Sequence, residues 1–261
     1  MSTTAYALRD STTMLRRYLL RARRYPLIGF LIGIPVIMLL LFVYVFGGTL
    51  GDGIAAGGGR AAYANYVTPG ILLLAIASAP QLTAIGVAQD MTEGIINRFR
   101  TMAIFRPSVL TGHVLGNLVQ LVIALAVVVG VAVAVGFRPT ATPVEWVAAA
   151  GLLTLVSFAV TWFGVACGLT ARSVESASNL PMPLILLPFL GSGFVPTESM
   201  PAGVSWAAEY QPFTPVMETI RGLLLGTGIG NSAWLAVAWS VALTVGCFYW
   251  ARSRYNREST R

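Results

Sequence analysis

The chain has 261 residues and a formal net charge of +7, with 56% hydrophobic and only 10% charged residues. A soluble domain carries roughly 25% charged residues, so this composition excludes an ordinary soluble protein and predicts a membrane protein. All seventeen basic residues are arginine. The absence of lysine excludes a phosphate-binding loop of the Gly-x-x-x-x-Gly-Lys-Ser/Thr kind, because that loop requires its lysine.

Residues 1–26 form a polar, basic segment that contains six of the arginines. Written as a helix, the segment places its apolar side chains on one side and its arginines largely on the other. Such a helix lies in the membrane interface, where its cations approach anionic headgroups. The sequence therefore predicts a cytoplasmic interfacial helix that Pro26 ends, with a solvated basic tail as the alternative.

Long uncharged runs predict an all-α membrane protein, because about 20 apolar residues in a helix cross the hydrocarbon core. One transmembrane domain is expected over residues 27–251, followed by a cytoplasmic tail over 252–261. A glycine-rich loop is expected over 47–66. Six transmembrane helices are expected at about 27–46, 67–89, 109–137, 146–170, 181–196 and 233–251.

The segment 197–229 is neither a tight turn nor a full crossing, because charged residues interrupt it and prolines divide it into two short pieces. These pieces are expected at about Val204–Tyr210 and Val216–Leu225. Irregular elements persist at membrane depth only when protein covers them or when they line a water-filled cavity. The pattern predicts an extracellular re-entrant helical hairpin, and a pair of amphipathic helices on the outer surface fits it equally well.

The orientation follows from the placement of arginine. With six crossings, fourteen of the seventeen arginines fall on the side that also holds both termini. The cytoplasmic side carries the excess of basic residues. Both termini are therefore expected in the cytoplasm.

The expected spans contain few groups for chemistry. The single histidine, His113, excludes a zinc site of the His-Glu-x-x-His kind, and Gly191-Ser192-Gly193 lacks the Gly-x-Ser-x-Gly frame of a nucleophile. No other ionisable residue is expected within a span, so transport would draw its energy from outside the spans. The mild polar residues usually bond between helices. Gln81 and Ser192, near prolines, are candidates for a substrate path.

The segment 90–106 is expected to form a cytoplasmic amphipathic helix. Its apolar residues recur at helical spacing, with polar and charged residues elsewhere on the helix. The apolar stripe contains Met91, Ile95, Phe99 and Met102. Such a face buries itself either in the membrane surface or in the groove of a partner protein, and the residues alone leave both readings open.

The order of these elements resembles the type-2 ATP-binding-cassette (ABC-2) exporter permeases, and it is most similar to their daunorubicin-resistance (DrrB-like) branch. The resemblance covers essentially the whole chain through loose motifs in a fixed order. Ala103 departs from it, since the family often has proline at that point. The motifs are Leu8-Arg9-Asp10, Met14-Leu15-Arg16-Arg17, Arg24-Tyr25-Pro26, Glu93-Gly94 with Arg98-Phe99-Arg100, Gly191-Ser192-Gly193-Phe194-Val195-Pro196, Met200-Pro201, Pro212-Phe213-Thr214-Pro215 and Arg221.

The resemblance implies a transmembrane permease subunit of an ATP-driven exporter of hydrophobic or amphiphilic compounds, such as a drug, an antibiotic or a lipid. Residues 90–106 would be the coupling helix that docks on a separate P-loop ATPase subunit, present in two copies. The implied ATPase contacts are Glu93, Gly94, Ile95, Arg98, Phe99, Arg100 and Met102. The second and fifth spans would line the route. The path and its extracellular gate are expected to involve Gln81, Ser192, Phe194, Glu218 and Arg221.

Further expectations concern partners and location. A second permease chain, either identical or similar, is expected beside this one, with membrane lipids around both. No catalytic residue, metal or cofactor is expected in this chain, and no nucleic acid partner, because ATP and Mg would bind to the ATPase. The expected location is the bacterial cell (inner) membrane, with multiple crossings. The alternative function is a membrane channel or scaffold that needs no ATP.

Overall fold

The computed structural model describes residues 12, 13, 15, 16, 27–54, 58–94 and 108–257. Within these ranges all regular structure is helical and no strand occurs. The helices are α2 (Leu27–Leu41), a π-helical turn (Phe42–Phe46), α3 (Gly47–Ile54), α4 (Gly59–Thr92), α6 (Ser108–Val135), α7 (Pro143–Thr170), α8 (Val174–Asn179), α9 (Met182–Leu190), a short 3-10 turn (Thr197–Ser199), α10 (Ala202–Tyr210), α11 (Phe213–Leu225) and α12 (Ser232–Arg257).

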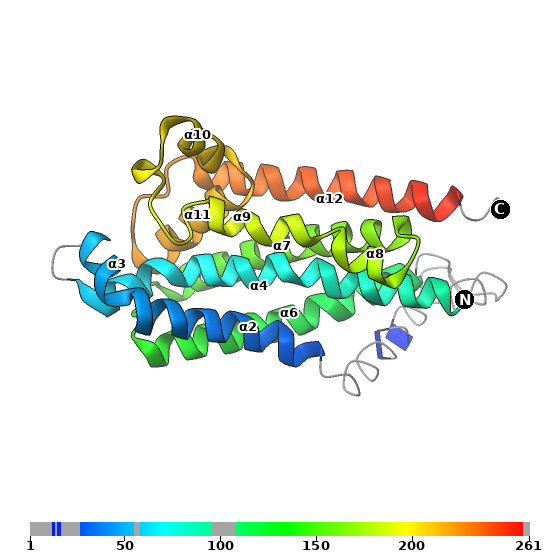
Figure 1. Ribbon diagram of the computed structural model, residues 1–261, viewed down its shortest axis with the longest axis horizontal. Helices are drawn as coiled ribbons and strands as arrows, with labels where there is room; N and C mark the ends of the chain where they lie inside the picture. Colours follow the sequence, from blue (N-terminus) through cyan, green and yellow to red (C-terminus); the bar gives the residue numbers. More distant parts are fainter. Residues whose placement is uncertain (1–11, 14, 17–26, 55–57, 95–107, 258–261) are drawn as a thin grey trace.

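The long helices lie side by side along the longest axis of the molecule (Figure 1). The right-hand end in Figure 1, here called the α8 end, holds α8 and the final turns of α4 and α12. The left-hand end, here called the α10 end, holds α3, α10 and the start of α12. Helices α8 and α9 run from the α8 end back toward the α10 end.

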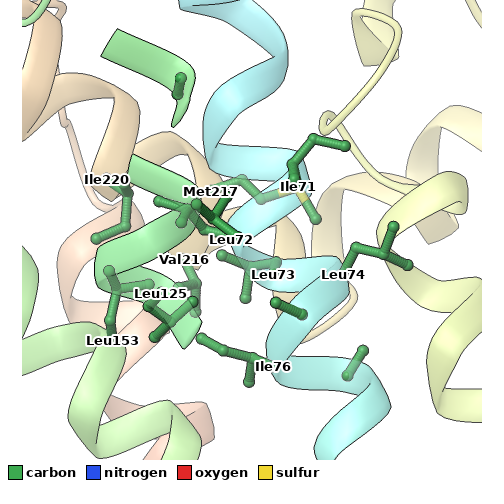
Figure 2. Packing of buried hydrophobic residues seen from close by; sticks show 14 of the residues in the cluster. Ile71, Leu72, Leu73, Leu74, Ile76, Leu125, Leu153, Val216, Met217 and Ile220 are labelled. Atoms are coloured by element: carbon green, nitrogen blue, oxygen red, sulfur yellow. The ribbon is translucent and has the colours of Figure 1, made fainter. Parts of the chain in front are cut away.

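The core of the bundle is built around α4 and α7. The most apolar windows of these two helices are 72% and 78% buried, against 22% for the α2–α3 stretch and 17% for α12. In a membrane protein, an exposed apolar face of a helix contacts lipid or a partner, whereas a helix buried on most sides lies inside the bundle. Figure 2 shows Ile71, Leu72 and Leu73 of α4 packed with Met217 and Ile220 of α11.

Within the described residues, five helices are long and apolar enough to cross a membrane. They are Gly29–Gly53, Gly59–Thr92, Leu110–Val135, Pro143–Thr170 and Ser232–Tyr255. The fifth expected span, 181–196, differs from the prediction. Helix α9 ends at Leu190, and the apolar stretch Val174–Leu190 that contains it is shorter than the other five. Pro188 lies inside α9, and Gly191 directly after it is extended, so the helix does not continue to residue 196.

The expected glycine-rich loop over 47–66 is wrong for most of its length, because α3 and the start of α4 are helical there. Glycine disfavours a helix in water by about 1 kcal/mol. At the end of a membrane bundle, unpaired backbone groups cost more than that, so the helix persists. The glycines also permit close contact: a Cβ on Gly51 would lie 1.9 Å from the Gly59 carbonyl oxygen.

Two further boundaries differ from the prediction. Helix α4 continues to Thr92, so Asp90 belongs to this long helix and not to a separate coupling helix. Helix α12 continues through Arg252 and Arg254 to Arg257, since arginine is a good helix former. The two helical pieces expected within 197–229 are present as α10 and α11. The predicted interfacial helix over 1–26 lies almost entirely outside the described residues.

Candidate functional site

The first candidate site lies at the α10 end, where the turn Gly191–Phe194 follows α9. This turn is buried and lies directly against α4, because neither Gly70 nor Gly193 carries a side chain. A Cβ on Gly70 would lie 2.5 Å from the Gly193 carbonyl oxygen, and a Cβ on Gly193 would lie 2.9 Å from Met217 Sδ on α11. The turn is therefore enclosed between α4 and α11.

Arg221 on α11 holds this turn through its guanidinium group. Its Nη2 donates to the carbonyl oxygens of Ser192, at 2.8 Å, and of Tyr66 on α4, at 3.3 Å. The guanidinium carbon lies 4.1 Å from the centre of the Tyr66 ring, which is a cation–π contact. One side chain thus joins α11, α4 and the turn after α9.

Phe194 adds an aromatic contact between the same turn and two other helices. Its ring centre lies 4.6 Å from that of Phe42 on the π-helical turn and 4.6 Å from that of Phe189 on α9, with the second pair stacked. The Tyr63 hydroxyl donates to the Phe194 carbonyl oxygen at 3.4 Å. Phe194 is 5% exposed, whereas Phe189 is 41% exposed. The stack therefore runs from the core to the surface.

Glu218 and Ser192 complete the predicted group at this end. The Ser232 hydroxyl, at the start of α12, donates to Glu218 Oε2 at 2.8 Å. Ser192 is 3% exposed, and its Oγ has no hydrogen-bond partner among the described residues. Four of the five predicted path residues, namely Ser192, Phe194, Glu218 and Arg221, thus lie at one end of the bundle.

Gln81 is not part of this group. It lies on α4 eleven residues beyond Gly70, and its Nε2 donates to the Ser178 carbonyl oxygen of α8 at 3.1 Å. Its observed role is to join α4 to α8, and the sequence alone had placed it with Ser192 because both lie near prolines.

Of the predicted ATPase contacts, the structure describes only Glu93 and Gly94. The Glu93 amide donates to the Gln89 carbonyl oxygen, and Gly94 has a φ of +68°, a backbone conformation that favours glycine. These two residues end α4 rather than begin a new helix. Ile95, Arg98, Phe99, Arg100 and Met102 lie outside the described residues.

A second candidate site at the α8 end was missed by sequence reasoning. Asp90, which had been expected in a cytoplasmic segment, is 3% exposed and lies against His113 of α6. His113 Nε2 and Asp90 Oδ2 are 3.0 Å apart. The expectation that no ionisable residue besides His113 lies within a span is therefore wrong for Asp90, which lies inside the long apolar helix α4. A helical periodicity extended from span two through Asp90 would have placed this carboxyl on the buried face of the helix.

Among the described residues, no group of three or more His, Cys, Asp and Glu side chains is arranged to hold a metal ion. The polar groups at the α10 end instead bond to backbone carbonyls between helices. Such an arrangement fixes one packing of three elements, and rearranging it requires all of these bonds to be exchanged together. The polar groups at the α10 end therefore hold α4, α11 and the turn after α9 together.

Comparison with known proteins identifies the family. The family described as ABC-2 type transporter matches residues 10–225. The daunorubicin resistance ABC transporter permease protein DrrB1 of Streptomyces coeruleorubidus is 30% identical over 227 residues, which are 85% of this chain and 77% of that protein. The probable doxorubicin resistance ABC transporter permease protein DrrC of Mycobacterium tuberculosis (strain ATCC 25618 / H37Rv) is 20% identical over 194 residues, or 74% of this chain and 70% of that protein.

A eukaryotic relative shares only part of its length. ABC transporter G family member 20 of Dictyostelium discoideum is 25% identical over 182 residues, which are 67% of this chain but 24% of that much longer protein. The family match and the similarity to DrrB1 together cover most of the helical bundle. This chain is a multi-pass membrane protein that belongs to the ABC-2 type transporter family, with DrrB-like permeases among its relatives.

Proposed function

We propose that the chain is the transmembrane permease subunit of an exporter that moves hydrophobic or amphiphilic compounds and is driven by a separate ATPase subunit. The observation that carries this proposal is the 30% identity to a daunorubicin resistance permease over 85% of the chain. The apolar faces of the outer helices support it, since they suit a lipid environment and a hydrophobic cargo. In this proposal the chain itself hydrolyses no ATP.

The proposed topology has six crossings, with both termini in the cytoplasm of a bacterial cell. Five crossings correspond to the five long helices. In this proposal α8 and α9 together make the remaining, shorter crossing, which is the fifth in chain order. Arg172 and Arg252–Arg257 at the α8 end, together with the arginines of the N-terminal segment, would then face the cytoplasm as the positive-inside rule requires. The α10 end is then extracellular.

The α10 end would act as the extracellular gate. Helix α11 is buried over most of its first two turns, whereas α10 is exposed at Val204, Trp206 and Tyr210. A half-length helix covered by protein is tolerated at membrane depth. In the proposed arrangement α11 re-enters the membrane while α10 lies at its surface, and Arg221 holds the gate closed through Ser192 and Tyr66.

The connection that follows α4 would receive the ATPase. Its residues from Glu93 to Met102 combine an apolar stripe with charged groups, as a helix that docks in a protein groove requires. Two ATPase copies and two permease chains would form the working unit. Closure of the ATPases around ATP would then move the connection, tilt α4 and α6, and open the α10 end to release the cargo.

Replacing Phe99 by Asp is expected to abolish stable binding of the ATPase, because a charge in the centre of a docked apolar stripe is desolvated without a partner. We expect the dissociation constant to rise at least about 100-fold, as for a central interface residue. The measurement is co-purification in detergent, followed by titration of the ATPase onto the purified permease. The double substitution Glu93→Ala/Arg98→Ala is expected to weaken the same complex while membrane insertion remains.

The matched control is Arg172→Ala, which removes an exposed charge at the same end of the bundle. This variant should bind the ATPase as the unchanged chain does. If complex formation survives Phe99→Asp, the assigned contact segment is wrong.

Two fluorescent probes distinguish the cargo classes: doxorubicin, the compound that the DrrC relative is named for, and a phosphatidylethanolamine carrying a fluorescent headgroup. Both are amphiphilic, but only the second requires the headgroup of a lipid to pass through the gate. The proposed function requires ATP-dependent movement of at least one of the two probes.

A further inference from the structure

A line of buried polar side chains runs along the interface between α4 and α6. Its members are Thr83 and Asp90 on α4 and His113, Asn117 and Gln120 on α6, each at most 6% exposed. The α6 residues follow one another at spacings of four and three, and the α4 residues are seven apart. Each set therefore lies on a single face of its helix. The surrounding contacts of this region, such as Val87 with Leu110 and Val114, are apolar.

The outermost members of this line form a direct contact between ionisable groups. His113 Nε2 and Asp90 Oδ2 are 3.0 Å apart, and both side chains are buried. A Cβ on Gly86 would lie 3.7 Å from the imidazole ring, so the α4 backbone passes directly beside it. Ionisable residues within membrane helices are costly, and they persist where they have a function.

The position of this pair relates it to the connection between the two helices. Asp90 lies in the last turn of α4, which ends at Thr92, and His113 lies in the second turn of α6, which begins at Ser108. The pair thus joins the last turn of α4 to the second turn of α6, the two helices that the connection 95–107 links in sequence. Deeper in the bundle, Asn117 Nδ2 donates to Thr83 Oγ1 and joins the helices a second time.

These polar contacts restrict motion more than apolar contacts do. Apolar side chains slide past one another with little directional preference, whereas a buried hydrogen bond is strong and directional and leaves unpaired groups when it breaks. Further along the described interface, at Pro80 and Gln120, no such hydrogen bond joins α4 to α6. Pro80 has no N–H to donate within α4, and Gln120 Nε2 has no hydrogen-bond partner among the described residues.

We propose that the Asp90–His113 pair makes the end of α4 and the beginning of α6 move as one unit. In this role both residues are positioning residues: they transmit the movement of the connection to the bundle and contact neither cargo nor ATP. This inference rests on the proposed function, because it presupposes an ATPase that acts on the connection.

The test is the number of probe molecules moved per ATP hydrolysed, measured in proteoliposomes that contain the permease and its ATPase. The double substitution Asp90→Val/His113→Leu replaces both members of the pair by apolar groups of similar size. We expect the ATPase to bind and to hydrolyse ATP within about twofold of the unchanged complex, and the transport ratio to fall about tenfold, a typical size for a lost coupling. Asp90→Asn, which keeps a hydrogen bond to His113, should give an intermediate ratio.

The control is Thr161→Val, which removes a buried hydroxyl that donates within α7, to the Ser157 carbonyl oxygen. Its transport ratio should equal that of the unchanged complex. An unchanged ratio in both Asp90 variants overturns the inference, as does a parallel fall of hydrolysis and transport. If the double variant does not fold, the transport ratio of Asp90→Asn alone tests the inference: a lowered ratio supports it and an unchanged ratio overturns it. A failure of the unchanged complex to move either probe contradicts the proposed function instead.

Discussion

Replacing Arg221 by Leu is expected to destabilise the α10 end and to reduce transport by about tenfold or more. A tenfold loss requires only about 1.4 kcal/mol, which is less than the expected cost of the lost contacts. The substitution leaves the carbonyl oxygens of Ser192 and Tyr66 without their charged donor and removes the contact with the Tyr66 ring. Hydrogen bonds from a charged donor contribute about 1.5 to 3 kcal/mol each, so the loss of these two bonds is expected to cost about 3 to 6 kcal/mol. The measurements are the thermal unfolding midpoint in detergent and probe transport per folded permease.

Two further variants make this prediction specific. Arg221→Lys should recover little, because an ammonium group does not stack on the Tyr66 ring as the planar guanidinium group does. Arg60→Leu is the matched control: Arg60 is exposed and stands 5.6 Å from the centre of the Tyr44 ring, a looser contact of the same kind. If Arg221→Leu transports as well per folded molecule as Arg60→Leu does, Arg221 does not hold the gate.

Replacing Gly164 by Ala is expected to disturb the packing of α7 against α4, the two most buried helices. A Cβ on Gly164 would lie 2.6 Å from the Pro80 carbonyl oxygen and 2.8 Å from Thr83 Cβ, so backbone must shift. Gly168, one turn further, meets Ala84 and Val87 at equally short distances. Small residues spaced by four allow such close helix contact in membranes. Overpacking of this kind costs about 1 to 3 kcal/mol.

The control for this prediction lies on the same helix. Gly151 of α7 has open space around the position of a Cβ, so Gly151→Ala should keep or raise the unfolding midpoint, because alanine favours a helix by up to about 1 kcal/mol. The unfolding midpoint in detergent is compared for the two alanine variants. Equal midpoints would show that the close contact between α4 and α7 does not stabilise the bundle.

The long helices could be predicted from sequence because their signal is local. The runs that became α6, α7 and α12 are apolar over about 20 residues or more, and that length alone specifies a membrane helix. Prolines likewise marked the division of 197–229 into α10 and α11. The family resemblance was also recoverable, since the order of loose motifs was sufficient to identify it, and the comparisons confirm it.

The errors arose where a distant contact outweighed the local signal. Gly51 and Gly59 are poor helix formers, but their close approach is what packs α3 against α4. Asp90 was assigned to solvent because charged residues usually are exposed, and its partner His113 lies 23 residues away. Neither the Gly51–Gly59 contact nor the Asp90–His113 pair could be identified from composition alone, because each depends on how two helices pack.

The central claim is that this chain is a permease driven by a separate ATPase, and one measurement tests it most directly. The purified complex of permease and ATPase is placed in proteoliposomes, and movement of the doxorubicin and phosphatidylethanolamine probes is followed with ATP, with a non-hydrolysable ATP analogue, and without the ATPase. A permease driven by a separate ATPase moves the probes against a gradient only when the ATPase is present and ATP is hydrolysed. Movement at an equal rate without ATP or without the ATPase would instead indicate a channel.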